Sequence, residues 1–282
     1  MKLKYGFFIM LLVMHTVLIG TASVEKDLAI SLSESQIQDL SLQGLSLVFY
    51  VKIVNSSSKD YYLSGYEYRF VVNQTDYIQI KTGLEENKIK IDALKDTFIS
   101  FPIKITYVHL FQVVKNLENQ DKASCYLTGI MNFSDRRKEK GKLPFAFSGE
   151  FPLFKPPNIA ILKLKINNMT IGGADLEVDV KLTNNNGFEL MVDKIAYKLQ
   201  LQAKPIGQGE IKGDKNIKNH QSRTFNLPLL LNFFEVGKEV YDILYQSEAI
   251  CHFQGEMEVQ TVWGKVTIPL DKEEEVKISR IP

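Results

Sequence analysis

Apolar and polar residues alternate along several short segments of this chain, which is the pattern of β-strands that bury one face. In the second half of the chain, apolar residues take every second position of Leu176–Leu182, and the alternation resumes over Phe188–Val192 and Ile195–Leu199. Phe225–Leu231 is a further predicted strand, and nearly all of its residues are apolar. Asn184–Gly187 separates two of these segments, and Asn and Gly tolerate the positive φ angles of turns. The pattern therefore predicts a mainly β protein built as an antiparallel sandwich.

The period then changes from that of a strand to that of a helix. Apolar side chains recur at i, i+3, i+7 and i+10, which places them on one face of a helix. We therefore predict a short α-helix over Phe233–Leu244 and a matching one in the first half of the chain. The apolar positions of the two faces are Phe233, Val236, Val240 and Ile243, and Tyr107, Leu110, Val114 and Leu117.

The two halves of the chain repeat one pattern, which is the first feature to look for in a sequence of this length. Leu47–Asn55 reads like Leu176–Asn184, and Ala123–Gly129 reads like Ala249–Gly255. Between these segments, in the same order, Tyr68–Phe70 matches Tyr197–Leu199, Gly83 matches Gly209, and Phe101-Pro102 matches Leu227-Pro228. We therefore predict two tandem domains, residues 27–154 and 156–278, each with one short α-helix. Lys155-Pro156-Pro157 is predicted to be a short, semi-rigid linker because a Pro-Pro pair is stiff and extended.

This ordered set of residues resembles the late embryogenesis abundant (LEA) type 2 family, also called the water-stress and hypersensitive-response (WHy) domain. Its signature is a strand ending in Asn-Pro-Asn, but here Asn185 replaces that Pro in the second copy and Ser56-Ser57 replaces Pro-Asn in the first. The resemblance implies fibronectin-III-like sandwiches and a stress-linked, non-enzymatic role. The matching positions are Asn184, Asn186, Phe188, Leu190, Val192, Tyr197, Leu199, Gly209, Pro228, Phe233–Leu244 and Gly255, and, in the first copy, Asn55, Tyr68, Phe70, Gly83, Pro102 and Gly129.

The first 22 residues have the organisation of a secretory signal peptide. Lys2 and Lys4 precede an apolar run over Gly6–Ile19, and cleavage after Ala22 would place small residues at both critical positions. An uncleaved anchor is the less favoured alternative, because the run is shorter than the ~20 residues of a membrane span. A lipoprotein signal is not supported, since Thr21 stands where the acylated cysteine is required. We therefore expect export to a periplasmic or extracellular location.

The charge balance and the two cysteines restrict the partners and the chemistry. The 34 basic and 33 acidic residues give a net charge of +1, which offers no general attraction to nucleic acid. Cys125 and Cys251 occupy the same position in the two copies, so they cannot approach to the ~5.5 Å Cα separation of a disulfide. We predict that both are free, buried thiols.

A search for catalytic or metal-binding patterns yields none, so we predict no catalytic, cofactor-binding or metal-binding residue and no cofactor. His15, His109, His220 and His252 are scattered without zinc-ligand spacing, and His252 should face away from its strand neighbour Cys251. We interpret Gly207, Gly209 and Gly213 as a hairpin loop, and Glu273–Glu275 as a charged strand end. A solvated basic loop is predicted at Arg136, Arg137, Lys138, Lys140 and Lys142. Glycosylation sequons begin at Asn55, Asn73, Asn132 and Asn168.

Two non-enzymatic functions follow as hypotheses. The first is a stress-protective or protein-interaction module of the cell envelope. The alternative is a lipid-binding or lipid-transfer module, in which the helix and the apolar strand Phe225–Leu231 open a groove. The partner is an unidentified protein or lipid and not a nucleic acid, and peripheral association with a membrane stays open.

Overall fold

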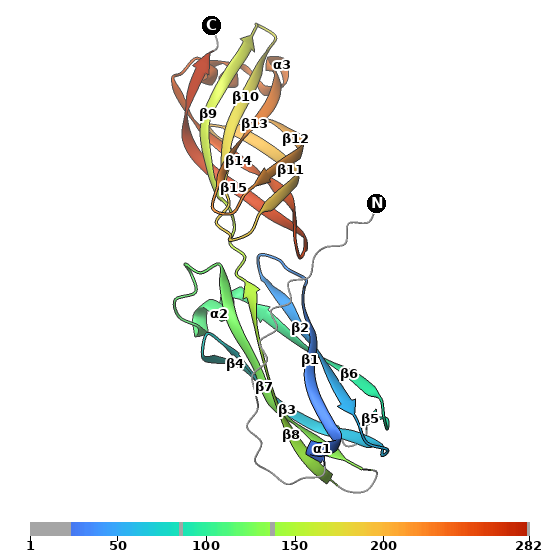
Figure 1. The fold of residues 1–282 in the computed structure, drawn as a ribbon. Coiled ribbons are helices and arrows are strands. Elements are labelled where there is room, and N and C mark those ends of the chain that lie inside the picture. Colours follow the sequence, from blue (N-terminus) through green and yellow to red (C-terminus); the bar gives the residue numbers. More distant parts are fainter. Residues whose placement is uncertain (1–23, 85–86, 136–138, 281–282) are drawn as a thin grey trace. The chain divides into compact units, whose positions relative to one another are not determined.

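The computed structural model describes residues 24–84, 87–135 and 139–280, which form two compact units (Figure 1). Unit 1 contains the described residues up to Leu153 except Leu40–Leu42, which are grouped with unit 2 and with the residues from Phe154 onward. No helix within the described ranges is long and apolar enough to cross a membrane. The predicted signal peptide, residues 1–22, lies outside these ranges, as do Arg136, Arg137 and Lys138 of the predicted basic loop.

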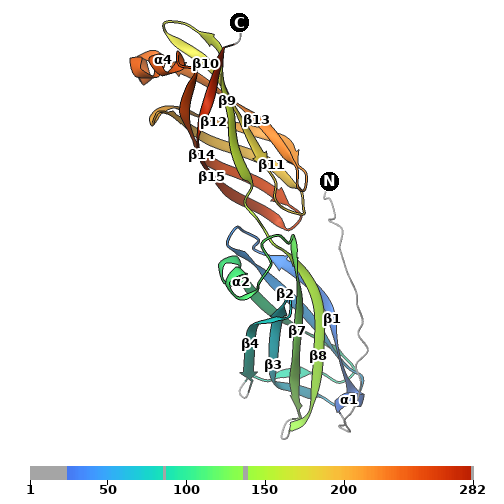
Figure 2. The same ribbon diagram turned by 90° about the vertical axis from the view of Figure 1, so that its left-hand side faces the viewer.

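Unit 1 is a sandwich of two antiparallel sheets. The first sheet has the order β1-β2-β6, and the second has the order β4-β3-β7-β8 with β5 paired to β3. Figure 2 shows β4, β3, β7 and β8 side by side. The elements are α1 (Val24–Asp27), β1 (Leu28–Gln38), β2 (Gly44–Asn55), β3 (Tyr61–Val72), β4 (Thr75–Gly83), β5 (Ile89–Ile91), β6 (Asp96–Thr106), α2 (Tyr107–Val113), β7 (Lys122–Ser134) and β8 (Glu139–Pro152).

Unit 2 repeats this arrangement with strands β9 to β15. One continuous path, β12-β11-β14-β15-β9-β10-β13, joins its two sheets, because the end of β15 pairs in parallel with β9 from Lys277 opposite Lys163 onward. The elements are β9 (Asn158–Met169), β10 (Gly173–Thr183), β11 (Leu190–Leu201), β12 (Lys204–Ile217), β13 (Ser222–Asn232), α3 (Phe233–Val236), α4 (Lys238–Leu244), β14 (Glu248–Thr261) and β15 (Gly264–Arg280).

The strand orders of the two units correspond element by element. The sheet β1-β2-β6 corresponds to β9-β10-β13, and β4-β3-β7-β8 corresponds to β12-β11-β14-β15. A three-stranded and a four-stranded sheet in this order form a fibronectin-III-like sandwich, so the predicted fold class is confirmed. Even an irregularity repeats, because β3 bulges at Ser64 against β7 and β11 bulges at Asp193 against β14.

The alternation in the sequence is realised as two buried cores. The buried residues of β2 include Phe49, Val51 and Ile53, and those of β10 include Leu176, Val178 and Val180. Each inward-facing row packs against the opposite sheet, where β7 and β14 place Leu127 and Phe253. Removal of this apolar surface from water is the main favourable contribution to the stability of each sandwich.

The predicted helix Phe233–Leu244 is interrupted in the structure. Gly237 has φ of +87°, which ends α3 and begins α4, because a residue in this region cannot continue a right-handed helix. In unit 1, α2 ends at Val113, although Val114 and Leu117 beyond it are still buried. The apolar face was therefore predicted correctly, but its helical extent was not.

Two interpretations of the glycines are wrong. Gly207, Gly209 and Gly213 lie within β12, whereas the hairpin turn is formed by Gln202 and Ala203, both at positive φ. Gly209 also does not correspond to Gly83, since Tyr197 pairs with Gly209 while its equivalent Tyr68 pairs with Ile80. A Cβ on Gly209 would lie 2.4 Å from the Tyr197 hydroxyl oxygen, so this glycine makes room for the tyrosine ring.

The charged segment Glu273–Glu275 does not end its strand. The strand β15 continues to Arg280, and the Glu274 carboxylate accepts a hydrogen bond from the Ile161 backbone N–H at 2.7 Å. This side chain therefore links β15 to β9 at a point before their backbone pairing begins.

Candidate functional site

A buried asparagine organises one end of unit 2. Asn184 follows β10 and is fully buried. Its Nδ2 donates to the carbonyl oxygens of Phe188 (2.7 Å), Ile217 (3.1 Å) and Lys218 (3.2 Å). Its Oδ1 accepts from the backbone and side-chain N–H groups of Asn186, at 3.0 and 2.9 Å. One amide thus holds together the loop after β10 and the connection from β12 to β13. We call this the asparagine node.

Unit 1 contains the same node around Asn55, which is 2% exposed. Its Nδ2 donates to the carbonyls of Lys59, Ile91 and Asp92, and its Oδ1 accepts from the backbone N–H and hydroxyl of Ser57. Each partner lies at the position equivalent to its counterpart in unit 2. An amide suits this place because it supplies both donors and acceptors to a buried loop whose backbone groups would otherwise lack partners.

The loop beside each node also holds the segment that enters the unit. In unit 2, Asn186 exchanges hydrogen bonds with the backbone N–H and carbonyl of Lys155, and Asn185 donates to the Pro156 carbonyl at 3.0 Å. In unit 1, Ser56 donates from its backbone and hydroxyl to the Asp27 carbonyl. Asn185 therefore uses a side-chain amide that the signature proline lacks, and the predicted linker is hydrogen-bonded to unit 2.

The node changes the interpretation of the sequons. The Asn55 amide nitrogen already donates to three carbonyls in a buried site, so it cannot carry a glycan in the folded unit. Asn73 holds a turn through the Ser124 N–H, Asn132 is half-buried in β7, and Asn168 is exposed on β9.

The two cysteines are free and buried, as predicted. Cys125 lies opposite Val72, and Cys251 lies opposite the equivalent Leu201. Burial in an apolar core disfavours the thiolate and raises the pKa of each thiol to about 12, and in Cys125 the nearby Glu150 carboxylate adds to this effect. Such thiols are poor nucleophiles, because the reactive species is the thiolate.

We expect both thiols to react with a maleimide only after unfolding. Mass analysis of the native protein should show an unmodified chain, and the same reagent in concentrated urea should add two labels. Because an unfolded thiol ionises near pH 8.5, the unfolded state loses protons first and stability should fall as pH rises above about 8.5. A disulfide-linked peptide pair, or labelling of the native protein within minutes, would contradict the burial of these residues.

The histidines within the described ranges do not form a chemical site. His252 points away from the buried Cys251, and its Nε2 lies 2.7 Å from Asp271 Oδ1, which lowers the pKa of that carboxyl. The His109 ring lies 5.1 Å from the Tyr77 ring. Among the residues that the structure describes, no group of three or more His, Cys, Asp and Glu side chains is placed to hold a metal ion.

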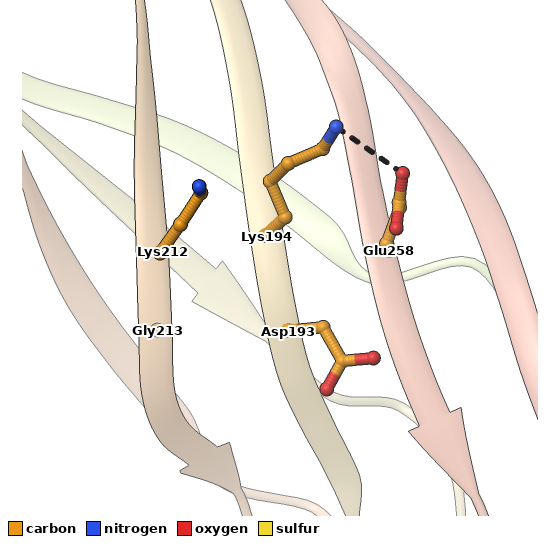
Figure 3. A pocket seen from close by; sticks show the side chains of 5 residues that line it. All are labelled: Asp193, Lys194, Lys212, Gly213 and Glu258. Atoms are coloured by element: carbon orange, nitrogen blue, oxygen red, sulfur yellow. Dashed lines mark ion pairs between the residues drawn. The ribbon is translucent and has the colours of Figure 1, made fainter.

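A charged depression lies on the outer face of the β11, β12 and β14 strands (Figure 3). The bulge at Asp193 leaves both Asp193 and Lys194 on the outside, and Lys194 forms ion pairs with Glu258 (3.3 Å) and Glu210 (3.6 Å). Hydrogen bonding to Glu258 raises the pKa of Lys194, and Lys265 lowers that of Glu258. Both shifts stabilise the charged forms, which is opposite to what a general acid or base at neutral pH requires.

The helical face proposed for a lipid groove contacts protein instead. Phe233, Val240, Ile243 and Leu244 are buried, and the rings of Phe233 and Tyr241 meet edge to face at 5.2 Å. The inward residues of the apolar strand, Phe225, Leu227 and Leu229, are buried as well. This packing favours the interpretation of the helix as part of the core.

Comparison with known proteins gives a family match within unit 2. No curated protein sequence matches the chain. A solved protein from Archaeoglobus fulgidus is similar over 44% of this chain and 95% of its own, with 14% identity and a TM-score of 0.34. Red sea bream transglutaminase is similar over 88% of this chain and 31% of its own, with 10% identity and a TM-score of 0.26. Residues 179–274 match the family model described as late embryogenesis abundant protein, and this match supports the assignment of unit 2 to the LEA type 2 family.

Proposed function

We propose that the protein is an exported, non-enzymatic, stress-protective protein made of two LEA type 2 units. The observation that carries this proposal is the asparagine node. It is built around Asn184, inside the matched segment, and is repeated around Asn55 in unit 1, outside that segment. Unit 1 is then a second, more divergent member of the family, the WHy-type domain that the resemblance implies.

The site chemistry supports a role that depends on surfaces. The LEA type 2 family is generally non-enzymatic. In this chain the buried nucleophiles are thiols with raised pKa, and the ionisable groups of the charged depression neutralise one another. The outer surfaces of the two sandwiches are therefore the parts of the protein available for interaction with a partner.

Export is supported by where unit 1 begins. Val24, in α1, is already fully buried, and the next helix residues lead directly into β1. Cleavage after Ala22 would thus remove the apolar segment and leave every described residue of unit 1 in place. The mature protein recovered from the extracytoplasmic fraction of its host should begin at Ser23, which mass analysis of its first peptide would show.

The protective role is tested by drying or heating an unstable enzyme, such as lactate dehydrogenase, with residues 23–282 of this protein. We expect the enzyme to retain several times more activity than with an equal mass of serum albumin, which controls for nonspecific crowding. The protein unfolded beforehand in acid should lose the advantage, because protection through a folded surface requires the sandwiches. Retention equal to that with albumin would contradict the proposal.

A further inference from the structure

Three large apolar side chains protrude from one end of unit 2. Ile171 is 90% exposed, Phe234 is 85% exposed and Leu230 is 82% exposed, and these are the largest values among the exposed large hydrophobic residues described. Such exposure means that each side chain projects into solvent and lines no groove. We call these three residues the apolar tip.

The three residues come from separate elements at the same end of unit 2. Ile171 lies in the turn between β9 and β10, and the neighbouring Gly172 accepts a hydrogen bond from Phe233 N–H at 3.0 Å. The Phe234 ring lies 3.7 Å from the point where a Cβ on Gly172 would stand. Leu230 is on the outer face of β13, two residues before Asn232, which pairs with Gly173.

The apolar tip lies at the end of unit 2 that is opposite the entry of the chain. The chain enters through Lys155 and Pro156, and β9 then runs its whole length from Asn158 to Met169 before the turn. The β9–β10 turn, α3, α4 and the end of β15 therefore lie at the far end (Figure 1). The β11–β12 hairpin lies there too, because Lys204 pairs with Glu239 of α4.

Unit 1 provides an internal comparison. The positions equivalent to Ile171, Leu230 and Phe234 are occupied by Leu42, Lys104 and Val108. A lysine at the position of Leu230 would oppose burial in an apolar medium. The fold itself therefore does not require an apolar residue at the position of Leu230, whereas Val108 at the position of Phe234 is also apolar and 71% exposed.

Several backbone groups close to the apolar tip have hydrogen-bond partners within unit 2. Thr170 N–H donates to the Gly173 carbonyl at 2.8 Å, Phe234 N–H donates to Asn232 Oδ1 at 3.1 Å, and Gly237 N–H donates to the Phe233 carbonyl at 3.0 Å. Backbone groups with internal partners can enter an apolar phase at low cost, whereas groups that depend on water cannot.

The residues around the apolar tip are those of an interfacial belt. Tyr241 and Tyr245 share a hydrogen bond through their hydroxyls, and the Arg280 guanidinium lies 5.0 Å from the Tyr245 ring centre. Tyrosine is enriched where apolar and aqueous phases meet, and Arg can extend its charge to the aqueous side. The charges nearby are mixed, because Glu239 pairs with Lys204, and Glu235 accepts a hydrogen bond from Asn232, the N-cap of α3.

We propose that the apolar tip inserts into the interfacial region of a lipid bilayer. A protein partner fits less well, since three protruding side chains cannot supply the ~800 Å² per partner that a stable protein interface buries. Because the charges around the tip are mixed, insertion depends on apolar burial and needs no anionic lipid. This inference goes beyond the protective role and does not rest on it.

The test is partition of the mature protein, residues 23–282, onto phosphatidylcholine vesicles, measured by flotation. Changing Ile171, Leu230 and Phe234 together to Ser should lower partition at least about tenfold, the loss expected when even one large side chain is no longer buried. Val262→Ser is the matched control, because Val262 is 70% exposed at the opposite end of unit 2, and it should leave partition unchanged. All four positions are exposed, so thermal melts should agree with that of the wild type.

A fluorescence measurement tests directly whether the apolar tip enters the bilayer. Trp263 is the only tryptophan, and it lies at the end of unit 2 away from the tip, so its emission should not shift with vesicles. Phe234→Trp should add an emission that shifts to the blue and is quenched by brominated lipid.

Three results would overturn the proposal. They are absence of wild-type partition, equal partition of the triple variant, and binding that needs anionic lipid or disappears in 1 M salt. A triple variant that instead loses self-association on a sizing column would identify a protein interface and would also overturn it.

Discussion

Replacing Val240 by Asp is expected to unfold unit 2. Val240 is fully buried on α4, so the new carboxylate would be enclosed among apolar side chains without a partner. The penalty is on the order of several kcal/mol, comparable with the whole stability of a domain, ~5–15 kcal/mol. Trp263 packs edge to face on Phe188 at 4.9 Å, so its fluorescence reports the unfolding of unit 2 specifically.

The matched control for this substitution is Lys238→Asp on the same helix. Lys238 is exposed, and an acidic residue in the first turn of a helix is favourable, so this variant should melt within about 0.5 kcal/mol of the wild type. A Val240→Asp protein that keeps the wild-type Trp263 transition would show that the inner face of α4 is not part of the core. It would also restore the hypothesis of a lipid groove beneath the helix.

Asn184→Ala is expected to destabilise unit 2 by about 3 kcal/mol or more, because it removes five hydrogen bonds of the asparagine node at once. The carbonyls of Phe188 and Ile217 would lose this donor in a buried site, where each unsatisfied group costs about 1–3 kcal/mol before relaxation. The Lys218 carbonyl would keep the Gln221 N–H as a donor. Urea unfolding followed at Trp263 measures the change.

Two further substitutions distinguish the node from general disturbance of its loop. Asn185→Ala removes a single exposed hydrogen bond to Pro156 and should cost at most about 1 kcal/mol. Asn184→Asp places a carboxylate opposite three carbonyl oxygens, which should raise the pKa of the new carboxyl above its usual ~3.9. Its protonated form can donate, so this variant should gain stability as pH falls toward 4. Equal effects of Asn184→Ala and Asn185→Ala would contradict the central role of the amide.

The asparagine node shows what a sequence motif reveals without a structure and what it leaves open. The sequence singles out Asn55 and Asn184 as the ends of matching strands, and Asn55 also as a sequon. It does not show that Asn184 reaches carbonyls 33 and 34 residues away, because hydrogen-bond partners at such separations depend on how the strands return. The apolar tip was missed for the same reason, since the fold brings Ile171 to the end of unit 2 that holds Leu230 and Phe234, about 60 residues later in the chain.

Features that depend on local periodicity could be predicted without a structure. Alternation predicted several of the strands and their buried faces, the helical spacing predicted an apolar face, and equivalent positions in the repeat placed Cys125 and Cys251 in separate cores. Two features could be read only from the folded unit. One is the strand register, which makes Gly83 and Gly209 inequivalent, and the other is the helix break at Gly237. A period constrains which side of an element is apolar, but pairing between distant strands and the φ angle of a glycine are set by the packing of the whole unit.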